Sequence, residues 1–113
     1  VRLRSISMER KQLEKTFCWK ISSELKIFKY EILQKEKEEI MADAYRIVSM
    51  ISIYEQLLEL CQKMKEEELT KCVQISGLLQ FLFDEWIKKP DTQYEEMEHI
   101  LCSVIHGLSE KAA

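Results

Sequence analysis

The chain has 113 residues and a formal net charge of -3, with 46% hydrophobic and 33% charged residues. A chain of this length and composition folds as one domain with a single core, which excludes a disordered protein and a second domain. Residues 1–37 carry ten Lys or Arg against five acids, whereas residues 38–113 carry seven against fifteen. Packing the first helix against later helices would neutralise this asymmetry; otherwise an acidic face stays open to a basic partner.

Strong helix breakers are scarce in this chain, where Gly77, Pro90 and Gly107 are the punctuating residues. Apolar residues also recur three and four positions apart, which is the period of an amphipathic helix. We therefore predict an all-α fold, a compact bundle of about five helices. The helical domain is expected over residues 8–108, between a basic N-terminal arm (1–7) and a C-terminal tail (109–113).

The first helix is expected over residues 8–33, with Ser5 or Ser7 as its cap. Its apolar stripe consists of Leu13, Phe17, Ile21, Leu25, Phe28 and Ile32. Trp19, Ile27 and Tyr30 fall off this stripe. They therefore predict a second, exposed apolar face that binds a partner or a second copy of the chain. The polar segment that follows predicts a break near Gln34–Glu38, because one unbroken helix to residue 66 would prevent a compact core.

The next apolar stripe runs from Ile40 to Cys61. The helix propensity is low in the middle of this stripe, because Ser49 and Ser52 stand there among β-branched residues. We therefore expect a kink at 49–52 that separates helices 38–49 and 52–66. A short helix follows the acidic run Glu66–Glu68 and ends before Gly77.

The window LLQFLFDEWIKK is the most apolar part of the chain and predicts a central helix packed on at least two sides. Pro90 is expected to stop it. Thr92 and Glu95 then have the spacing of a capping box, which predicts the start of the last helix. That helix is expected to end at Ile105 or His106, with Gly107 as its left-handed stop.

Two segments, EEIMADAYRIV at 38–48 and FLFDEWIKKPDTQYEEMEHIL at 81–101, resemble an uncharacterised family of small bacterial proteins, a domain of unknown function from gut Firmicutes. That family shows E-E-I-I-x-x-A-Y-E-I and a later L-Y-x-E-W-L before a polar turn and a final helix. The matching positions are Glu38, Glu39, Ile40, Ala44, Tyr45, Ile47, Leu82, Phe83, Glu85, Trp86 and Ile87. Arg46 stands where an acid is usual, and Phe83 where a Tyr is common. The resemblance, which covers about residues 12–105, implies a prophage or conjugative-element context and no activity.

His99, Cys102 and His106 form the sharpest cluster of chemically active side chains, because their spacing puts them on one side of the last helix, with Glu95 beside them. Imidazole and thiolate are the usual zinc ligands, but structural zinc sites draw ligands from two segments. We therefore predict no metal and a partly covered or partner-facing stripe.

The four cysteines, Cys18, Cys61, Cys72 and Cys102, contain no CxxC pair and are expected to be buried, reduced thiols.

Paired acids such as Asp84–Glu85, or the group Glu95, Glu96 and Glu98, are typical of solvated helix faces, so we predict neither an enzyme nor a cofactor.

The basic arm could touch nucleic acid through Arg2, Arg4, Arg10, Lys11, Lys15 and Lys20. A pI near 5.5 and the lack of a helix-turn-helix pattern disfavour a dedicated DNA reader.

These patterns favour a cytoplasmic binding protein without a membrane span. In the mobile-element setting, it would inhibit a host defence nuclease complex as an anti-CRISPR protein does. Its contact surface would be either an acidic face (Asp91, Glu95, Glu96 and Glu98) or the apolar face around Trp19, Ile27 and Tyr30. A homodimer through that apolar face is an alternative. The rival class is a DNA-binding or antitoxin-like regulator that uses the basic arm.

Overall fold

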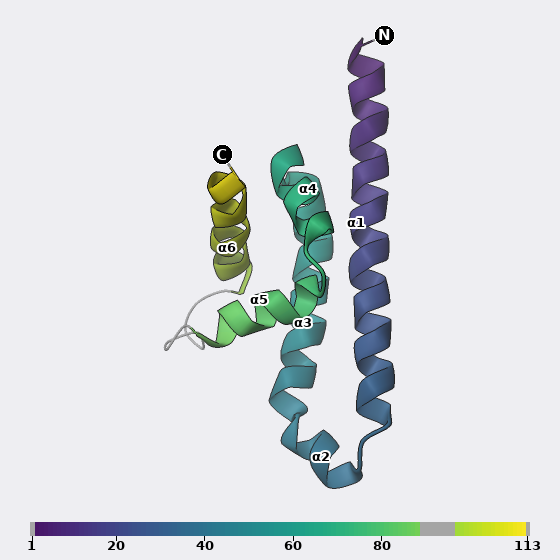
Figure 1. The fold of residues 1–113 in the computed structure, drawn as a ribbon, viewed down its shortest axis with the longest axis vertical. Coiled ribbons are helices and arrows are strands. Elements are labelled where there is room, and N and C mark those ends of the chain that lie inside the picture. The colour runs from purple at the N-terminus through teal and green to yellow at the C-terminus, as the bar shows by residue number, and fades with distance from the viewer. Residues whose placement is uncertain (1, 89–96, 113) are drawn as a thin grey trace.

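The computed structural model describes residues 2–88 and 97–112, with side chains for 9–88 and 97–108, and within these ranges the regular structure is entirely helical. The order is α1 (Arg2–Leu33), α2 (Lys37–Ala42), α3 (Ala44–Leu60), the 3₁₀ turn η1 (Cys61–Lys63), α4 (Glu66–Gln74), α5 (Leu78–Ile87) and α6 (Met97–Ala112). This confirms the predicted all-α bundle. The molecule measures 57 × 30 × 21 Å, and α1 runs along its longest dimension (Figure 1).

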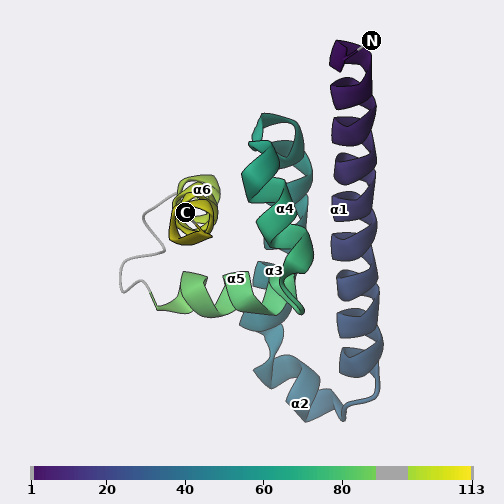
Figure 2. The same cartoon turned by 45° about the horizontal axis from the view of Figure 1, so that its top comes forward.

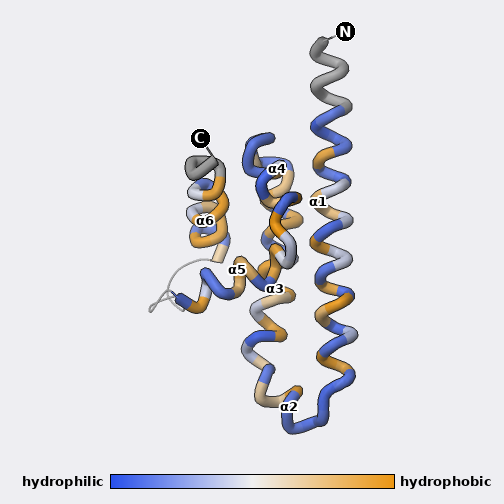
Figure 3. The backbone as a smooth tube through the Cα atoms, viewed as in Figure 1, coloured by the Kyte–Doolittle hydropathy of each residue, from blue (hydrophilic) through white to orange (hydrophobic). Residues whose placement is uncertain are grey.

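One stripe of α1 forms a wall of the core. Its predicted apolar residues from Phe17 to Ile32 are all buried, and they pack with residues of α3, α4 and α5. The alternation of apolar and polar residues along α1 is visible in Figure 3. The expected helix start at Met8 was wrong, because α1 begins at Arg2 and includes Ser5 and Ser7. Nothing between residues 2 and 8 breaks a helix, so the basic segment continues α1.

The break expected near Gln34–Glu38 is confirmed: α1 ends at Leu33 and α2 begins at Lys37. The turn at the foot of the bundle (Figure 2) is held by the Lys35 ammonium, which bonds to the carboxylate of Asp43. This bond lowers the pKa of Asp43. The pair therefore stabilises the turn above the unfolded pKa of the acid, and this contribution is lost as pH falls through the lowered value.

The kink expected at 49–52 was wrong, because α3 is continuous from Ala44 to Leu60. Ser49, Met50 and Ile53 are buried in the core, so tertiary packing outweighs the weak local helix propensity. The interruption lies instead at Asp43, between α2 and α3.

Gly77 separates α4 from α5, in a left-handed conformation with φ 69° that favours glycine. The helix α5 lies across the bundle (Figures 1 and 2) and packs on α1, α3 and α6. It buries Leu78, Leu79, Leu82, Phe83 and Trp86. This confirms the expected central helix.

The last helix, α6, runs to Ala112 and packs on α3, α4 and α5. The expected stop at Gly107 was therefore wrong: Gly107 does not adopt a positive φ, and residues of the expected tail continue the helix. A single glycine inside a helix costs only about 1 kcal/mol, which neighbouring turns tolerate. The expected stop at Pro90 and the capping box of Thr92 and Glu95 lie outside the described residues.

In the described part of the chain, no helix is both long enough and apolar enough to cross a membrane.

Candidate binding surfaces

The side of α1 that faces away from the core carries large apolar side chains. Trp19 is 73% exposed, Tyr30 67% and Leu33 74%. At 100° per residue these three lie within about 60° of one another, and Lys15 and Lys26 lie in the same arc. We call these five residues the outer stripe of α1. The sequence predicted exposure for Trp19 and Tyr30, and the structure places them there; Leu33 was missed.

The lysines of the outer stripe are exposed, and neither forms an ion pair within the described chain. The ion pairs inside α1 join its own residues, Arg10 to Glu14 and Lys20 to Glu24. Among the described side chains, no ion pair joins a basic residue of α1 to an acid of a later helix, so the expected partial neutralisation by packing stays a prediction. Its outward side remains basic.

Ile27 does not belong to the outer stripe, although its side chain is 58% exposed. It lines a cleft of about 440 Å³ between α1, α3 and the start of α5, together with Glu24 and Arg46. Arg46 closes one side of this cleft, since its guanidinium stacks 4.9 Å from the Phe28 ring centre and donates to Gln80 Oε1 at 2.7 Å. The structure thus places Ile27 beside the apolar face that it was expected to share with Trp19 and Tyr30.

Glu24 of α1 caps α5 from a distance. Its Oε1 accepts the backbone N–H of Leu79 at 2.8 Å, and the Lys20 ammonium lies 2.9 Å from its Oε2. The first N–H groups of a helix have no partner within it and favour a negative charge. This capping role of Glu24 was not predicted from the sequence. The sequence does hold one sign of it, because Gly77 precedes α5 and has no side chain that could cap the helix.

We expect Glu24→Ala to lower the free energy of unfolding by about 1–2 kcal/mol, because the Leu79 amide loses its acceptor and Lys20 its partner. Glu31→Ala is the matched control, since Glu31 is exposed, lies on the same helix and lines the same cleft. Urea unfolding followed by circular dichroism measures both. Equal stabilities of the two variants would show that Glu24 does not hold α5.

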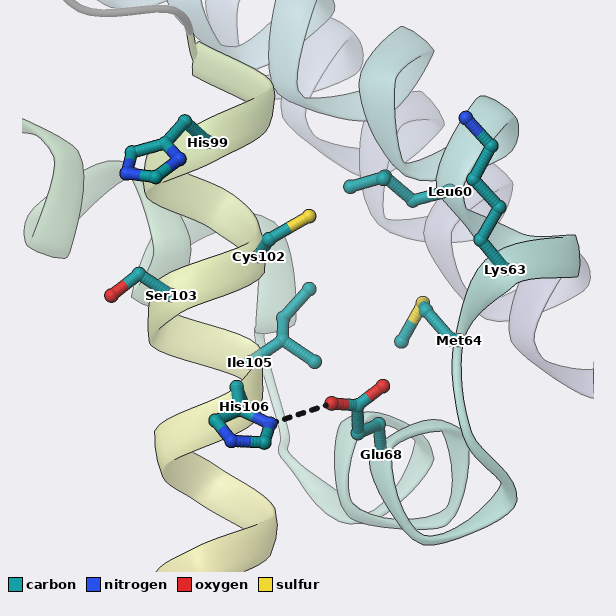
Figure 4. A pocket seen from close by; sticks show the side chains of 9 residues that line it. All are labelled: Leu60, Lys63, Met64, Glu68, His99, Cys102, Ser103, Ile105 and His106. Carbon is teal, nitrogen blue, oxygen red and sulfur yellow. Dashed lines mark hydrogen bonds and ion pairs between the residues drawn. The ribbon is translucent and has the colours of Figure 1, made fainter.

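A second cleft, of about 380 Å³, lies between α6 and the η1–α4 segment. Figure 4 shows Cys102 pointing toward Leu60 at the end of α3 and His106 toward Glu68 of α4, while His99 and Ser103 point to the other side of α6. Nδ1 of His106 lies 3.4 Å from Oε2 of Glu68. Glu68 is buried, and its Oε1 accepts the backbone N–H of Lys65 at 2.9 Å. This carboxylate therefore joins the start of α4 to α6.

The predicted His99, Cys102 and His106 stripe does not converge on one point. Within the described residues, no group of three His, Cys, Asp or Glu side chains is arranged to hold a metal ion. The expectation that Cys102 is buried was wrong, because its side chain is exposed beside α6. Partial desolvation, and next the nearby carboxylates of Glu98 and Glu68, still raise the pKa of its thiol. The thiol therefore stays protonated at neutral pH, which disfavours Cys102 as a nucleophile or a metal ligand.

The expected acidic face is described only at Glu98, whose Oε1 lies 4.0 Å from the ammonium of Lys63. Asp91, Glu95 and Glu96 lie outside the described residues. Of the other acids considered, Asp84 accepts from the Gln80 amide at 2.9 Å and Glu85 lies 3.6 Å from the Lys88 ammonium. Both pairs are local contacts along α5.

Comparison with models of protein families, with curated proteins and with solved structures finds no match for this chain. The resemblance to the Firmicutes family therefore stays a prediction from the sequence. Any assignment of function has to start from the surfaces described above.

Proposed function

We propose that this protein acts without catalysis, by binding another protein through the outer stripe of α1. The observation that carries the proposal is the exposure of Trp19, Tyr30 and Leu33 on the side of α1 opposite the core. Large apolar side chains gathered on one helix face are typical of contact surfaces, and Trp and Tyr are the residues that most often dominate binding energy.

The charge of the stripe indicates the kind of partner. Lys15 and Lys26 alternate with the aromatic rings and have no ion pair within the described chain, so an acidic surface would complement them. We favour an acidic protein over nucleic acid, because the whole chain carries a net charge of -3 and Leu33 adds an aliphatic contact.

Inhibition of a host defence nuclease remains our proposal for the biological setting, and it rests on the mobile-element context that the sequence resemblance implies. Of the two surfaces expected for such an inhibitor, we favour the apolar one. Glu98, the described member of the acidic face, is already close to Lys63.

The experiment is a pull-down from nuclease-treated lysate of the native host, with the tagged full chain as bait. We expect a partner that the parent captures and that Trp19→Ala/Tyr30→Ala fails to capture. With the purified partner, the double variant should bind at least about tenfold more weakly. Association with the parent should also slow as salt rises, because opposite charges steer the encounter.

Two further variants locate the surface. Val48→Ala removes an apolar side chain that is 63% exposed on α3, and it should bind like the parent. Replacement of Asp91, Glu95, Glu96 and Glu98 by Asn or Gln should also leave binding intact. Loss of binding in this acidic variant, with normal binding by Trp19→Ala/Tyr30→Ala, would contradict the proposal and assign the acidic face. Direct DNA binding that weakens steeply with salt would support the rival regulator.

A further inference from the structure

Two of the four cysteines lie next to each other in the fold, although 42 residues separate them in the sequence. Cys18 lies on α1 and Cys61 begins η1, at the end of α3. Cys18 is close enough to Cys61 to raise the pKa of the Cys61 thiol. Both also line one cleft of about 300 Å³ between α1 and η1. The structure thus brings together two thiols that the sequence treats as unrelated.

The backbone around this pair is held in place. Arg10 Nη2 donates to the carbonyl oxygen of Cys61 at 3.0 Å, and Arg10 Nε donates to Glu14 at 2.7 Å. Arg10 and Glu14 lie on α1, two turns and one turn before Cys18. The start of η1 is therefore fastened to the part of α1 that precedes Cys18.

The two thiols differ in accessibility. Cys18 is half-buried at the cleft, whereas Cys61 is 4% exposed. Burial, and next the neighbouring Cys18, raise the pKa of Cys61 to about 12. Cys61 is therefore protonated at neutral pH, and its thiol is the less suited of the two to react first with a dissolved oxidant.

We propose that Cys18 and Cys61 are a site of reversible oxidation, at which a peroxide converts the two thiols into a disulfide that ties α1 to η1. In the first step hydrogen peroxide oxidises the Cys18 thiol to a sulfenic acid and releases one water. In the second step the sulfur of Cys61 attacks the sulfur of Cys18, and the hydroxyl leaves as a second water. Two thiols and one peroxide thus give one disulfide and two waters.

The other cysteines provide an internal comparison. Cys72 is fully buried within α4, and Cys102 is exposed in the separate cleft beside α6. Because neither lines the cleft of the pair, peroxide should not link either of them to Cys18. Oxidation would close a covalent loop between residues 18 and 61, which reduces the freedom of the unfolded chain and stabilises the fold.

The test uses the full chain carrying Cys102→Ser, which removes the thiol most open to cross-linking between molecules. Stoichiometric hydrogen peroxide should give a product that has lost two hydrogens. Peptide mapping should join the Cys18 peptide to the Cys61 peptide. Oxidation should raise the melting temperature by about 10 °C, and dithiothreitol should reverse both changes.

Two variants in the same background separate the steps. Cys61→Ser should leave a Cys18 sulfenic acid that dimedone traps, whereas Cys18→Ser should leave Cys61 unmodified by the same dose. Circular dichroism of each reduced variant verifies that the helices are intact. Over-oxidation of Cys18 in the Cys102→Ser protein without a link to Cys61, or a link from either residue to Cys72, would overturn the proposal.

Discussion

Trp86→Ala should lower the free energy of unfolding by about 3–5 kcal/mol, a large part of the total stability of a domain of this size. Trp86 is only 8% exposed and belongs to the buried face of α5. Its indole Nε1 also donates to the hydroxyl of Tyr45 at 2.9 Å, which joins α5 to the start of α3. Truncation therefore opens a cavity and removes a hydrogen bond between two helices.

Trp19→Ala is the matched control, because it removes the same side chain from a position that is 73% exposed. It should change stability by no more than about 0.5 kcal/mol. Tyr45→Phe isolates the hydrogen bond and should cost about 0.5–1.5 kcal/mol. Urea unfolding followed by circular dichroism compares the three. If Trp86→Ala unfolds at the same urea concentration as Trp19→Ala, the position of α5 in the core is wrong.

Phe17→Ala should destabilise the protein by a similar amount, about 3–5 kcal/mol. Phe17 is fully buried at the point where α1 meets the rest of the core. Tyr30→Ala offers a comparison on the same helix, because Tyr30 is 67% exposed on the outer stripe and should cost little.

Thermal melting of these two variants measures which side of α1 faces the core. We expect the midpoint for Phe17→Ala to fall by at least about 10 °C, and the midpoint for Tyr30→Ala to stay close to that of the parent. The reverse order would mean that α1 is rotated about its axis. The outer stripe would then be part of the core and could not bind a partner.

The helical fold was predictable because the apolar residues of α1 and α5 repeat with the helical period over several turns. In α1 this period identified both the buried residues and the exposed Trp19 and Tyr30. The positions of interruptions were less predictable, because tertiary contacts decide them. Buried Ser49 and Met50 keep α3 continuous, and α6 continues through Gly107.

The candidate surfaces were only partly predictable for a related reason. Spacing along one helix shows which side chains share a face, but it does not show what another helix places beside them. The pairing of Glu24 with the Leu79 amide and the approach of Cys18 to Cys61 both join segments far apart in the chain. Without an alignment of related sequences, no local pattern identifies such pairs.

The long helix α1 also determines how cooperatively the protein unfolds. It packs on α3, α4 and α5, supplies the cap of α5 through Glu24, and fastens η1 through Arg10. If α1 separates, these elements lose their shared wall and their anchoring bonds together, so partial opening at α1 leads to global unfolding. The helix α6 packs on the same three helices, but it has 16 residues against the 32 of α1, so its opening exposes less of the core. Amide hydrogens in the middle of α1 should therefore exchange only through global unfolding, whereas those of α6 exchange through a smaller, local opening.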